Sequence, residues 1–217
     1  MVGQGVLRAC LADSEIEEVL AVGRSALGRE SASRPKLREL VCGDLFDLSG
    51  VEAELTGFDA CFFCLGASSV GMSEADYRRL TYELTLGIAG VLVRLNPAMV
   101  FEYVSGAGTD STEKGRVMWA RVKGQTENEL LGMGFRGAYM FRPGMIQPLD
   151  GIKSKTKSYR LLYSVVGPVL PLFKKMFPKY VTSTQELGRA MIAVAKRGYA
   201  KSVIEADEIG AIAVGEG

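Results

Sequence analysis

Short apolar runs alternate along the chain with longer stretches in which apolar residues recur at helical spacing. The run FDACFFCLG is almost continuously apolar, which is typical of a strand covered on both faces of a parallel sheet. In the last of the helical stretches, Ser183 or Thr184 provides an N-cap. The predicted strands are residues 19–22, 40–42, 60–65, 99–104, 138–141 and 203–205, and the predicted helices are residues 3–12, 73–94, 114–131 and 184–196.

This alternation predicts an α/β fold with a doubly wound parallel sheet, in a single domain that spans residues 1–217. The length is enough for one sizeable core and short for two independent ones. The Lys-rich stretch 150–157 and the apolar stretch 158–180 interrupt the alternation. We therefore expect a small substrate-side or lid region at about 150–182. The alternative for 158–180 is an amphipathic surface helix that touches a membrane or a partner.

The composition excludes several classes of function. A net charge of +1 argues against nucleic acid as a partner. Because no apolar run is long enough to cross a bilayer and no signal peptide is visible, we expect a cytoplasmic protein without a transmembrane segment. The chain contains no histidine, which excludes Ser-His-Asp and Cys-His nucleophiles and zinc sites built on histidine.

The four cysteines include one C-x-x-C pair, Cys61 and Cys64. The pair lies within an apolar run, and no second pair follows at the spacing of a zinc site. We therefore interpret the cysteines as core thiols and expect no metal site.

Glycines at the start of the chain, in MVGQG, open a predicted helix at Gly3. Backbone N–H groups and the dipole at such a helix end can hold a pyrophosphate. Arg24 ends the next strand about 20 residues later, where dinucleotide folds bind the adenosine ribose. An arginine there can pair with a 2′-phosphate, which favours NADP(H). A solvated arginine at a strand end is the alternative.

Two further strand ends fit the same cofactor. Asp44 follows a strand in VCGDLFD, where its carboxylate can accept a hydrogen bond from the adenine amino group. Leu65, Gly66 and Ala67 end the next strand, where small residues let the backbone run close to a cofactor. Each pattern taken alone also fits an ordinary turn.

Four ordered motifs, CFFCLGAS, YVSGAG, WARVKGQTENELL and YMFRPGMIQP, resemble the Tat-interacting-protein-like branch of the atypical short-chain dehydrogenase/reductases. The resemblance implies a Rossmann sheet, bound NADP(H) and a catalytic Ser, Tyr and Lys. Ser105 matches the serine and Lys123 the lysine of Y-x-x-x-K. Arg142, Pro143 and Gly144 match an R-P-G turn that flanks the nicotinamide.

The chain departs from this family at the catalytic tyrosine, whose position is held by Trp119. Indole donates an N–H but has no titratable hydroxyl. Lys123 can still hold the ribose, and some related reductases are understood to use lysine as the general acid/base. Other tyrosines, at 77, 82 and 139, can substitute only if the fold brings one of them to the site.

Two functions therefore stay open. The first is an NADP(H)-dependent reductase or epimerase-like enzyme that acts on a small carbonyl compound. The second is a catalytically weak NADP(H)-sensing or scaffold protein that acts through protein partners. In related folds the helices expected at 73–94 and 114–131 often pack into dimers, so a homodimer is one expected assembly.

The second departure is at the start of the chain. The family begins with a strand and G-x-x-G-x-x-G, and Gly3 matches the last of these glycines, so the resemblance implies that the first strand is missing from this sequence. Its place is between the strands at 19–22 and 60–65, which would then lie roughly 9–10 Å apart. We expect a natural start upstream of Met1, a sheet that closes by shifting, or a strand donated by another chain.

Overall fold

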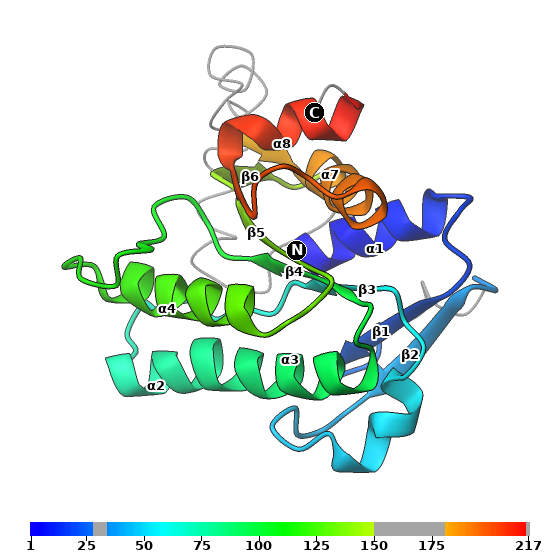
Figure 1. The fold of residues 1–217 in the computed structure, drawn as a ribbon, viewed down its shortest axis with the longest axis horizontal. Coiled ribbons are helices and arrows are strands. Elements are labelled where there is room, and N and C mark those ends of the chain that lie inside the picture. Colours follow the sequence, from blue (N-terminus) through cyan, green and yellow to red (C-terminus); the bar gives the residue numbers. More distant parts are fainter. Residues whose placement is uncertain (28–33, 150–180, 216–217) are drawn as a thin grey trace.

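The computed structural model describes residues 1–27, 34–149 and 181–215 (Figure 1). Most of the expected lid region, and the whole of the expected surface helix at 158–180, therefore lie outside the described residues. The strands are β1 (Val19–Gly23), β2 (Leu37–Val41), β3 (Ala60–Phe63), β4 (Val100–Val104), β5 (Gly137–Arg142), β6 (Met145–Gln147), β7 (Val181–Ser183) and β8 (Val203–Glu205). The helices are α1 (Val2–Ala12), α2 (Glu74–Arg78), α3 (Leu84–Leu95), α4 (Met118–Gly132), α7 (Thr184–Arg197) and α8 (Ala206–Val214).

The central sheet has the parallel strand order β3-β4-β5-β8. Its register aligns Ala60 with Val100 and Val100 with Gly137, so the carboxyl ends of these strands meet at one edge. A second parallel pair is β1-β2 and a third is β6-β7. Within the described residues β1 and β3 are not hydrogen-bonded to each other, so the sheet does not close by shifting.

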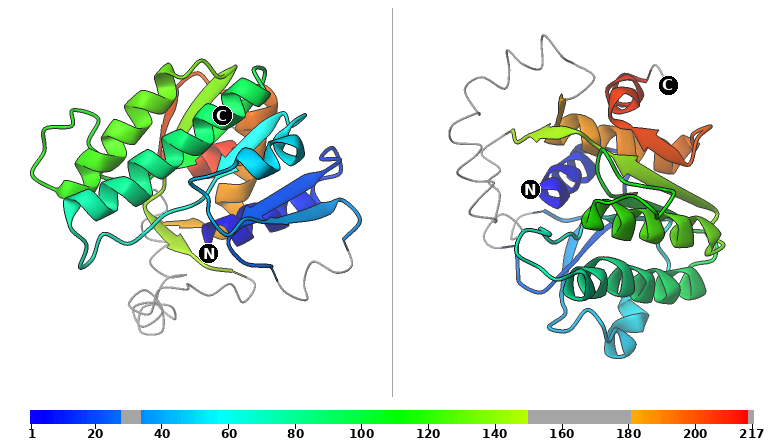
Figure 2. Two further views of the ribbon diagram at one scale, coloured as in Figure 1. Left: turned by 90° about the horizontal axis from the view of Figure 1, so that it is seen from below. Right: turned by 90° about the vertical axis from the view of Figure 1, so that its left-hand side faces the viewer.

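Helices cover the central sheet on both faces, which confirms the doubly wound α/β prediction (Figures 1 and 2). On the face of α3 and α4, Phe63, Phe101 and Leu130 belong to one cluster of core side chains. On the face of α1, α7 and α8, Phe141 and Met191 belong to the other. The alternation of side chains along each strand assigns neighbouring residues to opposite clusters.

Close contact of α1 with α7 depends on two glycines. A Cβ at Gly5 would lie 2.7 Å from the Cβ of Thr184, and a Cβ at Gly188 would lie 2.8 Å from the Cβ of Ala9. Ser183 caps α7 through a capping box with Glu186, as the N-cap prediction required. The two helices are thus fixed to each other over the sheet.

The boundaries differ from the sequence prediction at several places. The helix expected at 73–94 is interrupted by a π-helical turn at Arg79–Glu83. The helix expected at 114–131 begins only at Met118, because Asp110 accepts a hydrogen bond from the Gly115 N–H and keeps the preceding residues in a loop. The strand expected at 60–65 ends at Phe63. The chain also forms β6, β7 and α8, which no periodicity had predicted.

Candidate functional site

The predicted site residues gather where β4 and β5 end. Ser105 directly follows β4, Arg142 is the last residue of β5, and Lys123 lies on α4, which packs beside these strands. In parallel α/β sheets ligands bind at this carboxyl edge, because loops from several strands converge there. The fold therefore brings together the three polar residues predicted from separate motifs.

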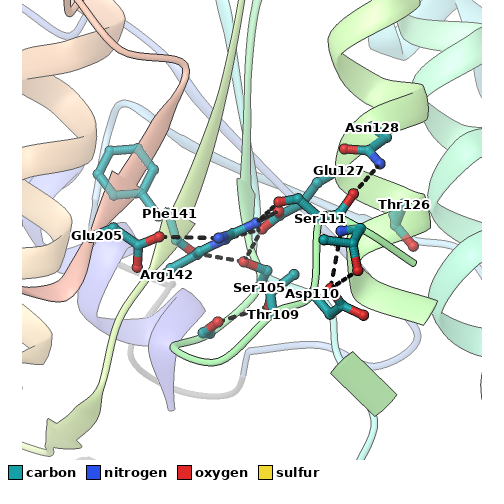
Figure 3. Close-up of polar contacts among 12 residues, drawn as sticks. Ser105, Thr109, Asp110, Ser111, Thr126, Glu127, Asn128, Phe141, Arg142 and Glu205 are labelled. Carbon is teal, nitrogen blue, oxygen red and sulfur yellow. Dashed lines mark hydrogen bonds and ion pairs between the residues drawn. The ribbon is translucent and has the colours of Figure 1, made fainter. Parts of the chain in front are cut away.

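Ser105 is held from two directions. Its backbone N–H donates to the Phe141 carbonyl at 2.9 Å, which extends the pairing of β4 with β5 by one residue. Its hydroxyl donates to a carboxylate oxygen of Glu127 at 2.5 Å and lies 3.2 Å from the Phe141 carbonyl oxygen (Figure 3). Only 7% of the serine is exposed. The hydroxyl therefore points towards the interior network and away from solvent.

Glu127 and Arg142 form a buried ion pair beneath this serine. Glu127 is fully buried, and Arg142 reaches both of its carboxylate oxygens through Nε and one Nη (Figure 3). The other Nη of Arg142 lies 3.0 Å from the Glu205 carboxylate at the end of β8. A buried charge is tolerated only when it is paired and hydrogen-bonded, and this fork meets both conditions. The pair raises the pKa of Arg142 against the effect of its burial.

Lys123 presents its amine at the same edge. Its Nζ donates to the backbone carbonyl of Ser105. Burial lowers the pKa of this amine to about 8, while the nearby Glu127 carboxylate acts in the opposite direction. Gly106 adopts a φ of +146°, which glycine adopts readily, and this lets the backbone pass beside the amine. The result is an amine that can gain or lose a proton near neutral pH.

Trp119 lies one helical turn before Lys123 and therefore on the same face of α4. Its ring packs over the turn after β4, where a Cβ at Gly108 would lie 3.5 Å from the indole. Two of the other tyrosines have contacts elsewhere. The Tyr139 hydroxyl accepts a hydrogen bond from the Tyr199 N–H, and the Tyr82 ring lies under the Arg78 guanidinium. Neither Tyr82 nor Tyr139 therefore takes the place of the catalytic tyrosine that the resemblance implies.

The first helix begins at the same edge of the sheet. A Cβ at Gly3 would lie 3.4 Å from the Cβ of Cys64, which directly follows β3. The chain then runs back along α1 to the start of β1, so β1 points in the same direction as β3. Leu65 and Gly66 are exposed beyond β3, and a Cβ at Gly66 would meet no atom within 4 Å.

The remaining predicted cofactor residues follow β1, β2 and β5. Arg24 and Asp44 are both exposed, and the Asp44 carboxylate accepts a hydrogen bond from the Phe46 N–H at 2.9 Å. The Pro143 carbonyl accepts from the Ala107 N–H and so ties the R-P-G turn, which includes Gly144, to the loop after β4. Ala67 is half-buried in the loop beyond β3. Their roles in binding stay predictions.

Cys61 and Cys64 do not face each other. Cys61 packs with the core under α3, whereas Cys64 packs on the opposite face with α1. Burial raises the pKa of Cys61 to about 12 and raises that of Cys64 further. Both thiols are therefore protonated at neutral pH, in agreement with their interpretation as core residues.

Sequence reasoning missed Glu127, Glu205 and Ser111, although all three contact Arg142 or Ser105. One signal was available for Glu127. It lies four residues after Lys123, and a helix that packs on a sheet buries that face. A carboxylate at a buried position requires a cationic partner, which the R-P-G arginine supplies.

Three solved structures illustrate which proteins share this arrangement of strands and helices, and two of them were solved with NAD bound. A UDP-N-acetylglucosamine 4-epimerase from Methanobrevibacter ruminantium aligns with 94% of this chain and 72% of its own, at a TM-score of 0.66 and 14% identity. A dTDP-glucose 4,6-dehydratase from Streptomyces venezuelae, solved with NAD, aligns with 98% of this chain and 77% of its own, at a TM-score of 0.65 and 16% identity. The Bordetella bronchiseptica enzyme WbmF, solved with NAD+, aligns with 96% of this chain and 73% of its own, at a TM-score of 0.60 and 14% identity. The chain has their Rossmann-type fold.

No family model matches the chain. Among curated proteins, the mitochondrial protein fmp52-1 of Aspergillus terreus is 27% identical over 149 residues, which are 67% of this chain and 62% of that protein. The fmp52-1 protein of Aspergillus oryzae matches at the same identity and coverage. The chain thus spans less than two thirds of the length of these relatives.

These relatives correct one expectation. The cytoplasmic location expected from the sequence is wrong, because the matching proteins of Aspergillus terreus, Aspergillus oryzae and Emericella nidulans are all named as mitochondrial. The expectation depended on a search for a secretory signal peptide, which does not bear on a mitochondrial location. In the described part of the chain, no helix combines the length and the apolar character that crossing a bilayer requires.

Proposed function

We propose that this chain is an atypical short-chain dehydrogenase/reductase that binds NADP(H) along the carboxyl edge of the sheet and reduces a small carbonyl compound. The observation that carries the proposal is the Lys123 amine, held by the Ser105 carbonyl at the edge where Rossmann-type folds bind their ligands. Its lowered pKa, at about 8, suits proton transfer near neutral pH.

The residues at this edge fit a dinucleotide. The amino end of α1 lies against the end of β3, so the backbone N–H groups of its first turn can meet a phosphate at the carboxyl edge of the sheet. Gly66 leaves open space beside it. Arg24 extends from the end of β1 into solvent, where a guanidinium can pair with a 2′-phosphate. These features support a nicotinamide cofactor, and Arg24 supports its phosphorylated form.

The bound cofactor would supply a hydride to the carbonyl carbon. Lys123, as an ammonium, would donate the proton that the carbonyl oxygen then requires, and in its protonated form it would also hold the ribose hydroxyls. Trp119, on the same face of α4, would line the substrate side and help to exclude water. Arg142 anchors the turn with Pro143 and Gly144, whose backbone would lie beside the nicotinamide.

A second function is favoured by Trp119, which replaces the usual proton donor with an indole. In that case the chain binds NADP(H) with little turnover and acts as a sensor or scaffold for a protein partner. Both functions share the cofactor and the edge at which it binds, so turnover separates them. The homodimer stays a prediction.

We also infer that one further parallel strand pairs with both β1 and β3. α1 contacts both strands, and it starts at the carboxyl edge and ends at the amino edge. A right-handed crossover then requires the strand that leads into α1 to lie between β1 and β3. The side chains of β4 are nearly all buried, whereas most of those in β1 and β3 are only half-buried, as expected where a neighbour is lacking.

The names of the curated relatives support a mitochondrial location for this chain. Microscopy of the tagged natural gene product, together with fractionation of the cells, tests that location. Retention in the cytosolic fraction under both methods would contradict it.

The experiment that tests the function uses Trp119, the single tryptophan of the chain, as its reporter. We expect NADPH to quench its fluorescence with saturation, and a panel of small carbonyl compounds to include one that oxidises the bound NADPH. Lys123→Ala should abolish this turnover, whereas Lys201→Ala, a lysine on the surface beside β8, should leave it unchanged. Binding without turnover across the panel supports the sensor. Failure to bind either NADPH or NADH rejects both functions.

A further inference from the structure

The proton of the Ser105 hydroxyl already takes part in a hydrogen bond within the protein. A serine hydroxyl has one proton to donate, and here it is directed to the Glu127 carboxylate at 2.5 Å. An ionised carboxylate is a stronger acceptor than a neutral carbonyl oxygen. While this bond holds, Ser105 can accept a hydrogen bond from a substrate but cannot donate one to its carbonyl oxygen.

Glu127 itself has no freedom to turn away from the serine. It is fully buried, and the guanidinium of Arg142 donates hydrogen bonds to both of its carboxylate oxygens (Figure 3). That guanidinium is fixed in turn by Glu205 at 3.0 Å and by the Ser111 hydroxyl at 2.5 Å. The carboxylate is therefore held from β5, β8 and the loop after β4.

The same carboxylate acts on Lys123. The two residues lie one turn apart on one face of α4, and both contact Ser105, Glu127 through the hydroxyl and Lys123 through the carbonyl. The charged group that acts on the amine is Glu127, which is itself paired with the Arg142 guanidinium and, through it, linked to Glu205. The negative charge of Glu127 keeps the pKa of Lys123 from falling further in its half-buried position.

We propose that Glu127 is a positioning residue of this site: it retains the Ser105 proton and fixes the Ser105 carbonyl against Lys123, so that the Lys123 ammonium, and not the Ser105 hydroxyl, presents a proton to a substrate carbonyl. This role rests on the proposed function, because it names the proton donor of that reaction. In this arrangement Ser105 holds the Lys123 amine through its backbone carbonyl and does not donate a proton to the substrate. It also accounts for a site that keeps its serine and lysine while an indole stands at the tyrosine position.

The test measures the lysine directly and needs no cofactor or substrate. Lys123 is modified by reductive methylation across a range of pH, and its labelling is followed by mass spectrometry. In the natural protein we expect half-maximal labelling near pH 8, the pKa of the amine. Glu127→Gln removes the negative charge that favours the ammonium and leaves Glu205 as the carboxylate paired with Arg142, so half-maximal labelling should move down by about one pH unit. Glu129→Gln, an exposed acid on the same helix, should not move it.

A second variant covers the case in which Glu127→Gln does not fold. Ser105→Ala leaves the buried ion pair intact and removes only the hydroxyl. Because the anchored carbonyl then loosens, Lys123 should label about five-fold faster above pH 9, the equivalent of one lost hydrogen bond. The midpoint of labelling should stay in place, since the charge of Glu127 is still present. An unchanged labelling rate in Ser105→Ala, or a midpoint that rises or stays in Glu127→Gln, would overturn the proposal.

Protection by the cofactor separates this proposal from the proposed function. If NADPH slows the labelling of Lys123 and Glu127→Gln shifts its midpoint, both stand. If NADPH gives no protection but the midpoint shifts, the cofactor assignment fails and the role of Glu127 in holding Lys123 survives. If NADPH slows the labelling but Glu127→Gln does not shift the midpoint, the positioning role of Glu127 is wrong and the cofactor assignment stands.

Discussion

Gly124 lies directly against the backbone of Asp110, so closely that a Cβ at Gly124 would come within 1.8 Å of the Asp110 carbonyl oxygen. The Asp110 N–H also donates to the Ala120 carbonyl at 3.1 Å. The loop after β4 is thus fastened to α4 next to Lys123. This contact places the lysine and the loop that carries Ser105 in a fixed relation.

We expect Gly124→Ala to disrupt the site as well as the fold. The added methyl group meets backbone atoms, which cannot rotate away as a flexible side chain can, so the loop or the helix must move. Overpacking of this kind typically costs about 1–3 kcal/mol and occasionally more. Urea unfolding should show that loss in the free energy of unfolding, and Lys123 should become more accessible to labelling.

The matched control is Gly87→Ala, an exposed glycine within α3. A Cβ there meets nothing within 4 Å, so the substitution should stabilise the protein by about 0.5–1 kcal/mol through helix propensity alone. If Gly124→Ala proved as stable as this control, the contact between α4 and the loop would not be as close as described.

The sequence predicts the order of elements well, because the alternation of apolar runs and helical faces is a strong signal in a parallel α/β fold. The strands at 19–22, 99–104, 138–141 and 203–205 were each found within a residue or two of their predicted ends. The short strands β6 and β7 were not predicted, because they lie within or beside the stretch after the R-P-G turn in which the alternation of elements is interrupted. The late start of α4 depends on the side chain of Asp110, which no hydrophobic pattern reports.

Within the site, the sequence predicts the residues that belong to family motifs but not their partners. Ser105, Lys123 and Arg142 come from three separate motifs, and the fold places them at one edge. Glu127 hydrogen-bonds with two of them, Ser105 and Arg142, yet it is one of two glutamates in a helix rich in polar residues. Its burial, and hence its need for Arg142, follows only from how α4 packs on the sheet.

Arg24→Ala tests the phosphorylated form of the cofactor. If the guanidinium pairs with the 2′-phosphate, the variant should bind NADPH more weakly by about 1–3 kcal/mol, while NADH binding changes little. Calorimetric titration of both nucleotides measures the two dissociation constants. The control is Arg38→Ala, an exposed arginine on β2 held by Glu18 and Glu54. Equal losses of affinity for NADPH and NADH would show that Arg24 does not bind the 2′-phosphate.

Hydrogen exchange of the protein purified from its own cells tests the strand inferred between β1 and β3. With that strand in place, the amides of residues 19–23 and 60–63 should exchange as slowly as those of β4, which has a neighbour on both sides. β8 is the internal comparison, because within the described strands it pairs only with β5. If β1 and β3 exchange as fast as β8 or faster, no strand lies between them.

Glu102 provides a prediction about stability and pH. This residue of β4 is fully buried, and neither carboxylate oxygen has a hydrogen-bond partner within the described structure. Burial raises its pKa well above the usual value, so the folded protein holds Glu102 protonated while the unfolded chain releases the proton above a pH of about 4.3. The folded state therefore binds more protons, and the free energy of unfolding falls as pH rises towards the folded pKa.

Glu102→Gln removes this proton uptake while it keeps the size of the side chain. The variant should gain stability relative to the natural protein, by at most about 1.4 kcal/mol for each pH unit above the unfolded pKa. Urea unfolding at pH 5, 6, 7 and 8 measures the difference, which should widen as pH rises. Glu129→Gln, exposed on α4, should show no such trend. A difference that stays constant with pH would mean that Glu102 is ionised in the folded protein, and its carboxylate would then need a partner.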